Sequence, residues 1–185
     1  MGIALADTAA EYGAIVDLVL GPVNIAPRNS SINIINVTTA QSMAYECISR
    51  FGSCDIAILA AAVADYTPAK VSGEKLKKES ADLFLKLKPT TDIAETLGQS
   101  KKPSQILAGF ALETDNELDN AKGKLLRKNL DIIILNSLRE DGAGFGHETN
   151  KITIIDRNNI IDKFELKSKE DAAADILEKI ISLIR

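Results

Sequence analysis

Helical and strand-like hydrophobic patterns alternate along this 185-residue sequence, and the alternation constrains the fold more than any other feature. Three runs are apolar almost without interruption: 55–63 (DIAILAAAV), 105–112 (QILAGFAL) and 130–136 (LDIIILN). Such runs are typical of strands that are buried on both faces of a parallel sheet. Helical patterns lie between and before them, at 38–52, 92–98 and 116–129. The order predicts an α/β fold with a doubly wound, mostly parallel sheet.

Two segments interrupt this alternation. Residues 74–78 (EKLKK) and 83–89 (LFLKLKP) are interpreted as paired strands of an antiparallel flap, because leucine alternates with phenylalanine and lysine along the second segment. Near the C-terminus, 151–156 (KITIID) and 163–167 (KFELK) flank RNN and predict a hairpin, which an amphipathic helix follows. We therefore predict a Rossmann-like sheet with an antiparallel flap and a C-terminal hairpin.

The chain opens with a helical pattern, an alanine-rich stretch that Gly13 closes. A doubly wound sheet normally opens with a strand and a turn whose glycines bind phosphate. No GxGxxG or Walker A motif occurs in the sequence, so either the fold starts unconventionally or its first strand is missing. Further along, Thr38 with Gln41 and Thr114 with Glu117 have capping-box spacing and predict the starts of two helices.

The amino-acid composition limits the kinds of molecule that we expect this protein to bind. Aromatic residues make up 4% of the chain and the net charge is −4, so we expect neither a base-stacking platform nor a basic nucleic-acid surface. No apolar run approaches the ~20 residues of a transmembrane helix, and the N-terminus lacks the pattern of a signal peptide. The two cysteines have no CxxC spacing, which favours buried thiols in a reducing compartment. We expect a cytoplasmic protein with no nucleic-acid or membrane partner.

Candidate ligand-binding residues follow the predicted strands, because ligands of open α/β sheets bind beyond the carboxyl ends of the strands. Asp65 follows the first buried run, and Lys70, Lys75, Lys77 and Lys78 come within the next residues. Further candidates are TTDIA at a helix start, GFALET and LNS at two strand ends, and Lys124 with Lys128 one helical turn apart. A carboxylate followed by clustered lysines predicts either a phosphate-bearing ligand at this edge or a solvated loop.

Each of these features also has a simpler interpretation. Lysines on a helix flank are mostly solvated, and lysines on a flap often protect an edge strand from aggregation. Asp65 is equally suited to capping a turn, and Thr91 with Asp92 to capping a helix, although a helix N-terminus also offers free N–H groups to an anion. His147 and Asn150 in GAGFGHETN belong either to a lid or to a surface loop.

The motifs occur in an order that resembles a known family. AAVADY (61–66), EKLKK (74–78), TDIA (91–94), GFALET (109–114), KGKLLRKNLDIIILN (122–136) and FGHETNKI (145–152) resemble the bacterial phosphopantothenoylcysteine synthetase, a coenzyme A biosynthesis domain that commonly follows a flavin-dependent decarboxylase. The resemblance runs through nearly all of the chain. It is more specific than a glycine motif alone.

The resemblance implies a ligase that joins 4′-phosphopantothenate to cysteine. The carboxylate of phosphopantothenate would attack the α-phosphate of CTP, releasing pyrophosphate and leaving an acyl-cytidylate. The amine of cysteine would then displace CMP and form the amide. Lysines would offset the repulsion between two phosphate compounds, and a lid would exclude water from the reactive acyl-cytidylate. Mg²⁺ is expected with the triphosphate, with no protein ligand identified.

The family's site residues transfer to matching positions. Leu59, Ala60, Ala61 and Asp65 would form part of the cytidine nucleotide pocket, and Ala61 with Ala62 would line the acyl-phosphate region. Lys75 would contact the nucleotide phosphate and assist the second half-reaction as the catalytic residue. The remaining contacts with CTP would come from Thr91, Asp92, Ile93, Ala94, Phe110, Lys124 and Lys128, with Phe110 beside the nucleotide and the two helix lysines on the triphosphate.

The family also carries a strand and a glycine-containing loop before the helix that begins this chain, with an asparagine and an arginine that have no counterpart here. The resemblance therefore implies one synthetase-like domain over 1–185 that is incomplete at its N-terminus, has no decarboxylase domain and forms a homodimer. A second hypothesis stays open, a Rossmann-like protein that binds a nucleotide without catalysis. A dehydrogenase is a weaker third, because no glycine fingerprint occurs.

Overall fold

The computed structural model describes residues 1–75, 83–113, 116–137 and 149–184. Its main sheet has five strands in the order β10–β9–β7–β6–β3. Three neighbouring strands are parallel: β3 (Ile56–Leu59) at one edge, β6 (Ile106–Glu113) and β7 (Ile132–Ser137). Two strands run antiparallel to them: β9 (Ile152–Asp156) and β10 (Ile161–Lys163). The predicted mostly parallel α/β fold is confirmed, and the predicted C-terminal hairpin forms one edge of the sheet.

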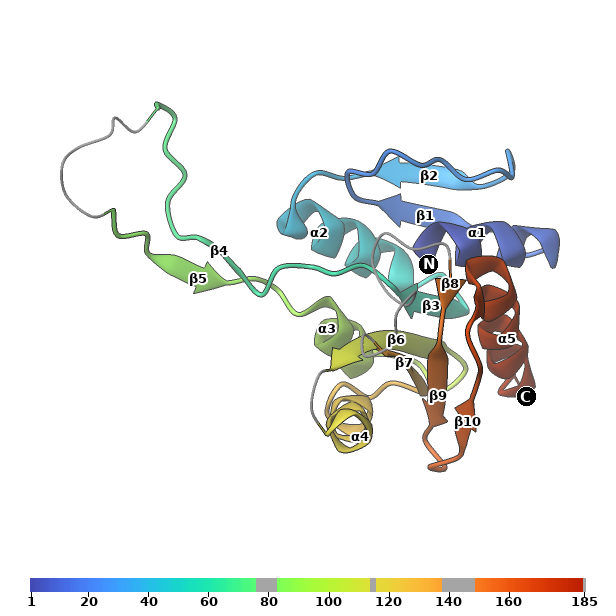
Figure 1. Cartoon of the computed structure of the whole chain (residues 1–185). Helices are drawn as coiled ribbons and strands as arrows, with labels where there is room; N and C mark the ends of the chain where they lie inside the picture. Colours follow the sequence, from blue (N-terminus) through green and yellow to red (C-terminus); the bar gives the residue numbers. More distant parts are fainter. Residues whose placement is uncertain (76–82, 114–115, 138–148, 185) are drawn as a thin grey trace.

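Helices cover both faces of this sheet, as in a doubly wound fold (Figure 1). On one face lie α1 (Gly2–Glu11) and α5 (Lys169–Ser182), which pack against each other. On the other face lie α2 (Ala40–Phe51), α3 (Ile93–Ser100) and α4 (Glu117–Arg127). The side chains of β7 alternate between the two cores: Ile132 and Ile134 contact the first, and Ile133 and Leu135 the second. This alternation explains why the strand reads as an unbroken apolar run.

Two further strands lie apart from the main sheet. β1 (Asp17–Leu20) and β2 (Asn33–Asn36) pair in parallel with each other. Within the described residues, neither hydrogen-bonds to the five-stranded sheet, so β3 has one unpaired edge. The sequence predicted a strand at β3 that is buried on both faces, yet its four side chains are only half-buried. The difference arises at the open edge, because β3 has no neighbouring strand there.

The predicted flap exists with a different pairing. β4 (Tyr66–Pro68) pairs antiparallel with β5 (Leu87–Pro89), and together they form the base of an arm that projects from the body (Figure 1). The prediction that 74–78 pairs with 83–89 is wrong for its described part, since Leu87 lies opposite Pro68. The leucine alternation correctly predicted a strand at β5. Its partner, however, is β4, which lies closer to the main sheet than the predicted partner 74–78 does. Residues 76–78 lie outside the described residues.

Helix starts differ slightly from the predicted ones. The cap of α2 is Thr39 with Ser42, one residue after the predicted Thr38 and Gln41: the Ser42 N–H donates to the Thr39 hydroxyl at 3.0 Å, and the Thr39 N–H donates to the Ser42 hydroxyl at 3.1 Å. Ser42 therefore takes the place of the usual glutamate or glutamine. α4 begins after Asn116, and Thr114 lies outside the described residues.

Two short strands, β8 (Thr149–Asn150) and β11 (Lys167–Ser168), pair antiparallel before α5. The hydroxyl of Ser168 accepts a hydrogen bond from the Asp171 N–H at 3.0 Å and caps α5. No described helix is long and apolar enough to cross a membrane.

The carboxylate of Asp131 connects several of these elements. It accepts hydrogen bonds from the Leu107 N–H in β6 at 2.7 Å and from the Lys101 ammonium, which follows α3, at 2.6 Å. Arg157 in the β9–β10 turn forms an ion pair with it at 3.2 Å. The Lys101 side chain is only 7% exposed, so its charge depends on this partner.

We expect Asp131→Ala to lower the free energy of unfolding by about 3–5 kcal/mol, because it leaves the buried Lys101 ammonium without its carboxylate. Urea unfolding followed by circular dichroism measures this change. Glu165→Ala is the matched control, since Glu165 is 94% exposed and its ion pair with Lys151 is 3.8 Å long. Equal stability of the two variants would contradict a structural role for Asp131.

Candidate functional site

A cleft of about 2360 Å³ runs along the open edge of β3, beside β1, and reaches the segment that follows β3, the start of α3 and the end of α4. It is lined by all of the predicted nucleotide-binding residues except Lys75: Leu59, Ala60, Ala61, Asp65, Thr91, Asp92, Ile93, Ala94, Phe110, Lys124 and Lys128. These residues come from segments up to about seventy positions apart in the sequence. The fold therefore brings them to one edge of the sheet, as expected for a ligand site in an open α/β sheet.

The segment after β3 is fixed to the start of α3 by Thr90. Its N–H donates to the Asp65 carbonyl oxygen at 2.9 Å, and its hydroxyl donates to the Ala64 carbonyl oxygen at 2.6 Å. The exposed Asp65 and Thr91 are thereby held on neighbouring segments. Because Thr90 donates these two hydrogen bonds to the segment after β3, the Asp65 carboxylate is not needed as a cap there.

Asp92 is the N-cap of α3, as the sequence predicted. Its carboxylate accepts a hydrogen bond from the Glu95 N–H at 3.0 Å, which satisfies one of the free donors of the first helical turn. Its second oxygen forms an ion pair with the Lys128 ammonium at 2.8 Å. Two predicted site residues from different helices are therefore in direct contact.

This contact changes the acidity of Asp92. Partial burial by itself raises the pKa of the carboxyl, but the hydrogen bonds from the Lys128 ammonium and the Glu95 N–H outweigh burial and lower the pKa below its usual value. Asp92 is therefore ionised at neutral pH and holds the Lys128 ammonium at the cleft. An incoming phosphate group would compete with Asp92 for this ammonium.

Gly98 permits the close approach of α3 to Lys128. A Cβ at position 98 would overlap with the Lys128 carbonyl oxygen. Only glycine at this position therefore lets α3 lie so close to the Lys128 backbone. The Asn129 side-chain amide also donates to the Gly98 carbonyl oxygen at 2.6 Å. Asn129 itself has a φ of 53°, a left-handed conformation that asparagine tolerates. The end of α4 is thus placed by backbone contacts with α3.

Lys124 and Lys128 lie one turn apart, as predicted, and the Lys128 N–H donates to the Lys124 carbonyl oxygen at 3.0 Å. Lys128 stands at the C-cap, one residue beyond α4. Both side chains are half-buried at the cleft, so the interpretation of fully solvated lysines is wrong. Partial desolvation strengthens their attraction for an anion.

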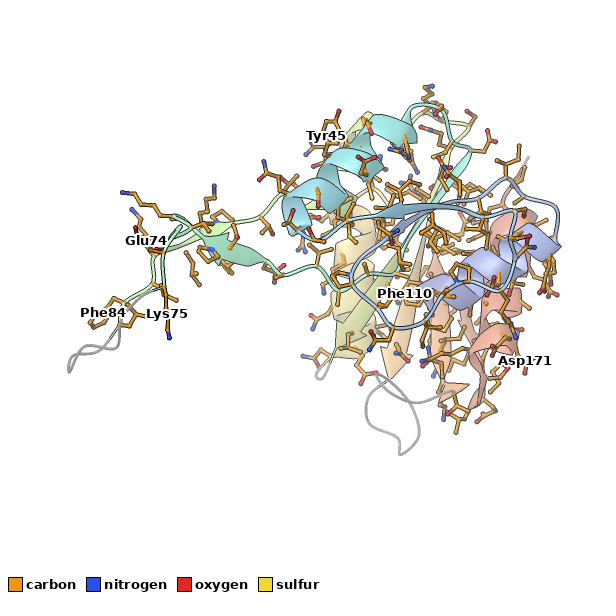
Figure 2. All side chains as sticks on the ribbon, turned by 90° about the horizontal axis from the view of Figure 1, so that it is seen from above. Tyr45, Glu74, Lys75, Phe84, Phe110 and Asp171 are labelled. Atoms are coloured by element: carbon orange, nitrogen blue, oxygen red, sulfur yellow. The ribbon has the colours of Figure 1, made fainter. Side chains whose placement is uncertain are left out.

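Phe110 reaches the cleft from the other face of the sheet. Its ring packs against the core under α1 and α5, whereas Ile93 and Ala94 belong to the core under α2, α3 and α4. Figure 2 shows Phe110 beside α1. The cleft therefore passes around the carboxyl edge of the sheet and is lined from both faces.

Lys75 does not join this group. Figure 2 shows it on the projecting arm with Glu74 and Phe84, away from Phe110 and the body of the protein. Its side chain is exposed, and it does not line the cleft. Lys77, Lys78 and His147 lie outside the described residues.

The environments of two asparagines, Asn136 and Asn150, could not be predicted from sequence patterns. Among the described residues, the Asn136 side-chain oxygen, near the end of β7, is buried without a hydrogen-bond partner, and so are both polar side-chain atoms of Asn150 in β8. Asn136 lies in the LNS segment that we named as a strand-end candidate, and its partner Ile152 is two residues from Asn150. Asn150 is 1% exposed and lies in β8, so the interpretation of this residue as part of a surface loop is wrong.

The fold and cleft define a class of protein: an α/β protein with a Rossmann-like, mostly parallel sheet and a ligand cleft at the carboxyl ends of its strands. The family model for the DNA/pantothenate metabolism flavoprotein C-terminal domain matches residues 1–184. The chain belongs to this family, and the resemblance found in its motifs is confirmed.

Curated relatives cover the whole chain. It is 59% identical over 184 residues to a cysteine/cysteine sulfinic acid decarboxylase from an unknown prokaryotic organism, covering 100% of this chain and 51% of the relative. It is 41% identical over 183 residues to the coenzyme A biosynthesis bifunctional protein CoaBC of Bacillus subtilis (strain 168), covering 99% of this chain and 45% of the relative. The chain thus spans about half the length of these relatives.

A solved structure has the same fold. The crystal structure of the C-terminal domain of a coenzyme A biosynthesis bifunctional protein CoaBC superposes with a TM-score of 0.81 at 32% identity, covering 97% of this chain and 79% of that one. This match confirms the arrangement of the central sheet and its helices.

Gly98→Ala is expected to destabilise the protein by about 1–3 kcal/mol, because the added methyl group must push α3 away from the Lys128 backbone. Gly123→Ala in α4 is the matched control. No atom lies within 4 Å of its added methyl group, so it should stabilise the helix by about 0.5–1 kcal/mol. Thermal unfolding of both variants checks the opposite signs, and a stable Gly98→Ala variant would contradict the close approach.

Lys128→Met is expected to raise the pKa of Asp92, because it removes a hydrogen bond and a positive charge from the carboxylate while burial remains. Carboxyl NMR titration of Asp92 measures the shift. In the wild-type protein the Asp92 contribution to stability is present above the unfolded-state pKa and is lost as the pH falls through the lowered folded-state pKa. Lys163→Met, far from α3 in β10, should leave the Asp92 titration unchanged.

Proposed function

We propose that this chain contributes the nucleotide site of a CTP-dependent ligase that joins 4′-phosphopantothenate to cysteine in coenzyme A biosynthesis. In the first step, a carboxylate oxygen of phosphopantothenate bonds to the α-phosphorus of CTP, and the bond to pyrophosphate breaks. In the second step, the amine nitrogen of cysteine bonds to the acyl carbon, CMP leaves, and the amine loses a proton. The reaction links two polyanions and needs cationic groups at the phosphates.

The observation that carries this proposal is the gathering of the predicted nucleotide residues in one cleft. Residues at the end of β3, within β6, at the start of α3 and at the end of α4 meet there, although no local pattern in the sequence requires it. The family membership and the two coenzyme A biosynthesis relatives support the same assignment. The name of the 59% identical relative describes a decarboxylase, an activity that belongs to a protein about twice as long as this chain.

The charges at the cleft suit a triphosphate. Lys124 and Lys128 supply two ammonium groups, and the N-terminus of α3 supplies backbone N–H groups beside Thr91 and Asp92. In the free protein the Asp92 carboxylate forms an ion pair with the Lys128 ammonium. Binding of a phosphate group would release this ion pair and use the ammonium for the ligand.

Mg²⁺ would reach the cleft already bound to the phosphates of CTP. Within the described ranges, no group of three histidine, cysteine, aspartate or glutamate side chains could hold a metal ion by itself. Mg²⁺ bound to phosphates needs only one or two protein carboxylates, and the exposed Asp65 at the cleft fits such a role. We assign no metal ligand beyond this.

Lys75 is proposed as the catalytic lysine on a mobile lid. It must approach the cleft from the arm, because the arm projects away from the body in this structure (Figure 2). Closure of the arm would bring a positive charge to the phosphates and shield the acyl-cytidylate from water. The arm carries exposed apolar side chains, Val71 at 87% and Phe84 at 90%, which a second copy in a homodimer would also cover.

The proposed cellular location, oligomeric state and neighbouring domain are those that the family resemblance implies. We propose a cytoplasmic enzyme that acts as a homodimer beside a decarboxylase domain upstream in the polypeptide. The second candidate function is a Rossmann-like protein that binds a nucleotide without catalysis, and the separation of Lys75 from the cleft favours it. Nucleotide binding is common to both candidates, and turnover separates them.

Calorimetric titration with Mg·CTP, Mg·ATP and NAD tests the nucleotide site. We expect selective binding of Mg·CTP and a loss of at least about a hundredfold in affinity for Lys124→Ala/Lys128→Ala, because each of the two charged hydrogen bonds contributes about 1.5–3 kcal/mol. Lys122→Ala/Lys163→Ala removes the same charge away from the cleft and should bind CTP normally. Equal loss in both double variants would contradict the assigned site.

Pyrophosphate release upon addition of phosphopantothenate and cysteine then separates the two candidates. A ligase releases pyrophosphate, and Lys75→Ala should lower turnover while leaving CTP affinity within a few-fold. Binding of CTP without pyrophosphate release, by the chain joined to its upstream segment, would favour the nucleotide-binding protein.

A further inference from the structure

The side chain of Lys128 runs along α3 toward the N-terminus of that helix. Its backbone lies against Gly98 in the second turn of α3, whereas its ammonium lies 2.8 Å from the Asp92 carboxylate at the N-cap. Along the helix these two positions are about 9 Å apart. Figure 1 shows α3 and α4 side by side, and Lys128 reaches across the contact between them. Because its backbone is fixed, the ammonium stays within reach of the start of α3.

Both oxygens of the Asp92 carboxylate have partners in this structure. Oδ1 accepts the hydrogen bond from the Glu95 N–H, and Oδ2 forms the ion pair with Lys128. The Lys128 side chain is 21% exposed and the Asp92 side chain is 40% exposed, so the ammonium is the less hydrated partner. A partly desolvated ammonium requires an anion beside it. Asp92 is the anion that the protein itself supplies.

The ion pair lies beside backbone groups that suit a phosphate. Ile93 and Ala94 are the first two residues of α3, and their N–H groups have no acceptor within the helix. Both residues line the cleft, as Lys128 does. A phosphate group at this position would meet the two backbone donors and the Lys128 ammonium, which the Asp92 carboxylate already binds. Phosphate and carboxylate are therefore competitors for one cation.

The contacts of Asp92 give its side chain a role different from that of a phosphate contact. Asp92 is ionised at neutral pH, because the hydrogen bonds from Lys128 and the Glu95 N–H lower its pKa. An ionised carboxylate accepts hydrogen bonds but donates none, and the same holds for phosphate oxygens. The Asp92 carboxylate therefore acts on a bound phosphate through Lys128 and not by binding the phosphate itself.

We infer that Asp92 is a positioning residue that exchanges with phosphate at Lys128. Its carboxylate holds the ammonium before the nucleotide binds, releases it to the triphosphate, and binds it again as inorganic pyrophosphate leaves. The inference rests on the proposed function, because it takes Lys128 as a contact of the triphosphate. The cap of α3 persists through the exchange, since the hydrogen bond from Glu95 uses the other carboxylate oxygen.

The exchange has an effect of definite sign on affinity. If Asp92 only capped α3 and kept Lys128 in place, removal of its charge would leave phosphate binding unchanged or weaken it. If Asp92 competes with phosphate, removal of its charge strengthens phosphate binding, because the ligand no longer has to displace a carboxylate. Asp92 thus lowers the affinity for pyrophosphate and favours release of this leaving group.

Calorimetric titration with inorganic pyrophosphate compares the wild-type protein with Asp92→Asn. Asparagine is as good an N-cap as aspartate, so this variant removes the charge and keeps the cap. We expect pyrophosphate to bind on the order of tenfold more tightly, because it no longer replaces a charged hydrogen bond at Lys128. Asp92→Ser, which also keeps a cap, should change the affinity in the same direction. Glu165→Gln removes one negative charge from an exposed residue outside the cleft and should leave the affinity unchanged.

The same comparison in the Lys128→Met background shows whether the effect passes through Lys128. There Asp92→Asn should no longer strengthen pyrophosphate binding, since the two residues act as a pair. In the wild-type protein, saturation with pyrophosphate should raise the pKa of Asp92, because the carboxyl loses the Lys128 hydrogen bond. Carboxyl NMR titration measures this pKa, which a purely structural role would leave unchanged.

Four results would overturn the inference: pyrophosphate binding by Asp92→Asn that is no tighter than that of the wild type, an equal gain in the Lys128→Met background, an Asp92 pKa that pyrophosphate does not change, or no pyrophosphate binding by either protein. Mg·CTP, Mg·ATP and NAD are titrated alongside. Tighter pyrophosphate binding by Asp92→Asn without a preference for Mg·CTP would support the exchange and contradict the proposed function alone.

Discussion

The carboxylate of Asp131 is the contact on which the arrangement of the sheet most depends. It binds the backbone of β6, the lysine after α3 and the arginine of the β9–β10 turn at the amino ends of the parallel strands. The buried Lys101 and the half-buried Arg157 are thereby neutralised by one acid, so desolvation of these charges is offset. With the amino ends tied together, the carboxyl ends of β6 and β7 form the opposite edge in a fixed register. The cleft runs along the open edge of β3 and reaches this end of the sheet after β3.

The packing of α3 against the end of α4 places the charges of Asp92 and Lys128 at the cleft. The glycine at position 98 lets α3 lie against the backbone of Lys128, and the N-cap of α3 then meets the Lys128 ammonium. The same contact lowers the pKa of Asp92 and holds the lysine in place before a ligand arrives. A phosphate group bound as proposed above would have to replace the Asp92 carboxylate at this ammonium. The arm differs, since it carries Lys75 outside the body and away from the cleft.

Much of the fold could be predicted because its signals are local. The apolar runs at β6 and β7 and the helix pattern of α5 each depend on a few consecutive residues, and all three were correct. The errors arose where a distant partner decided the outcome. Leu87 pairs with Pro68 instead of the nearer lysine segment. The start of α2 is a smaller, local error, because Thr39 and Ser42 form the cap one residue after the predicted pair. β3 is half-buried because its second neighbour is absent from the described sheet.

The sequence by itself determined the fold class, the order of the elements and, through motif resemblance, which residues to place at a nucleotide site. These follow from hydrophobic periodicity and from short motifs, which the chain carries regardless of its packing. Only the tertiary structure decided that Asp92 and Lys128 form an ion pair, that Phe110 reaches the cleft from the opposite face, and that Lys75 lies apart. Distances between residues far apart in sequence are set by how helices and strands pack, and no local pattern encodes them.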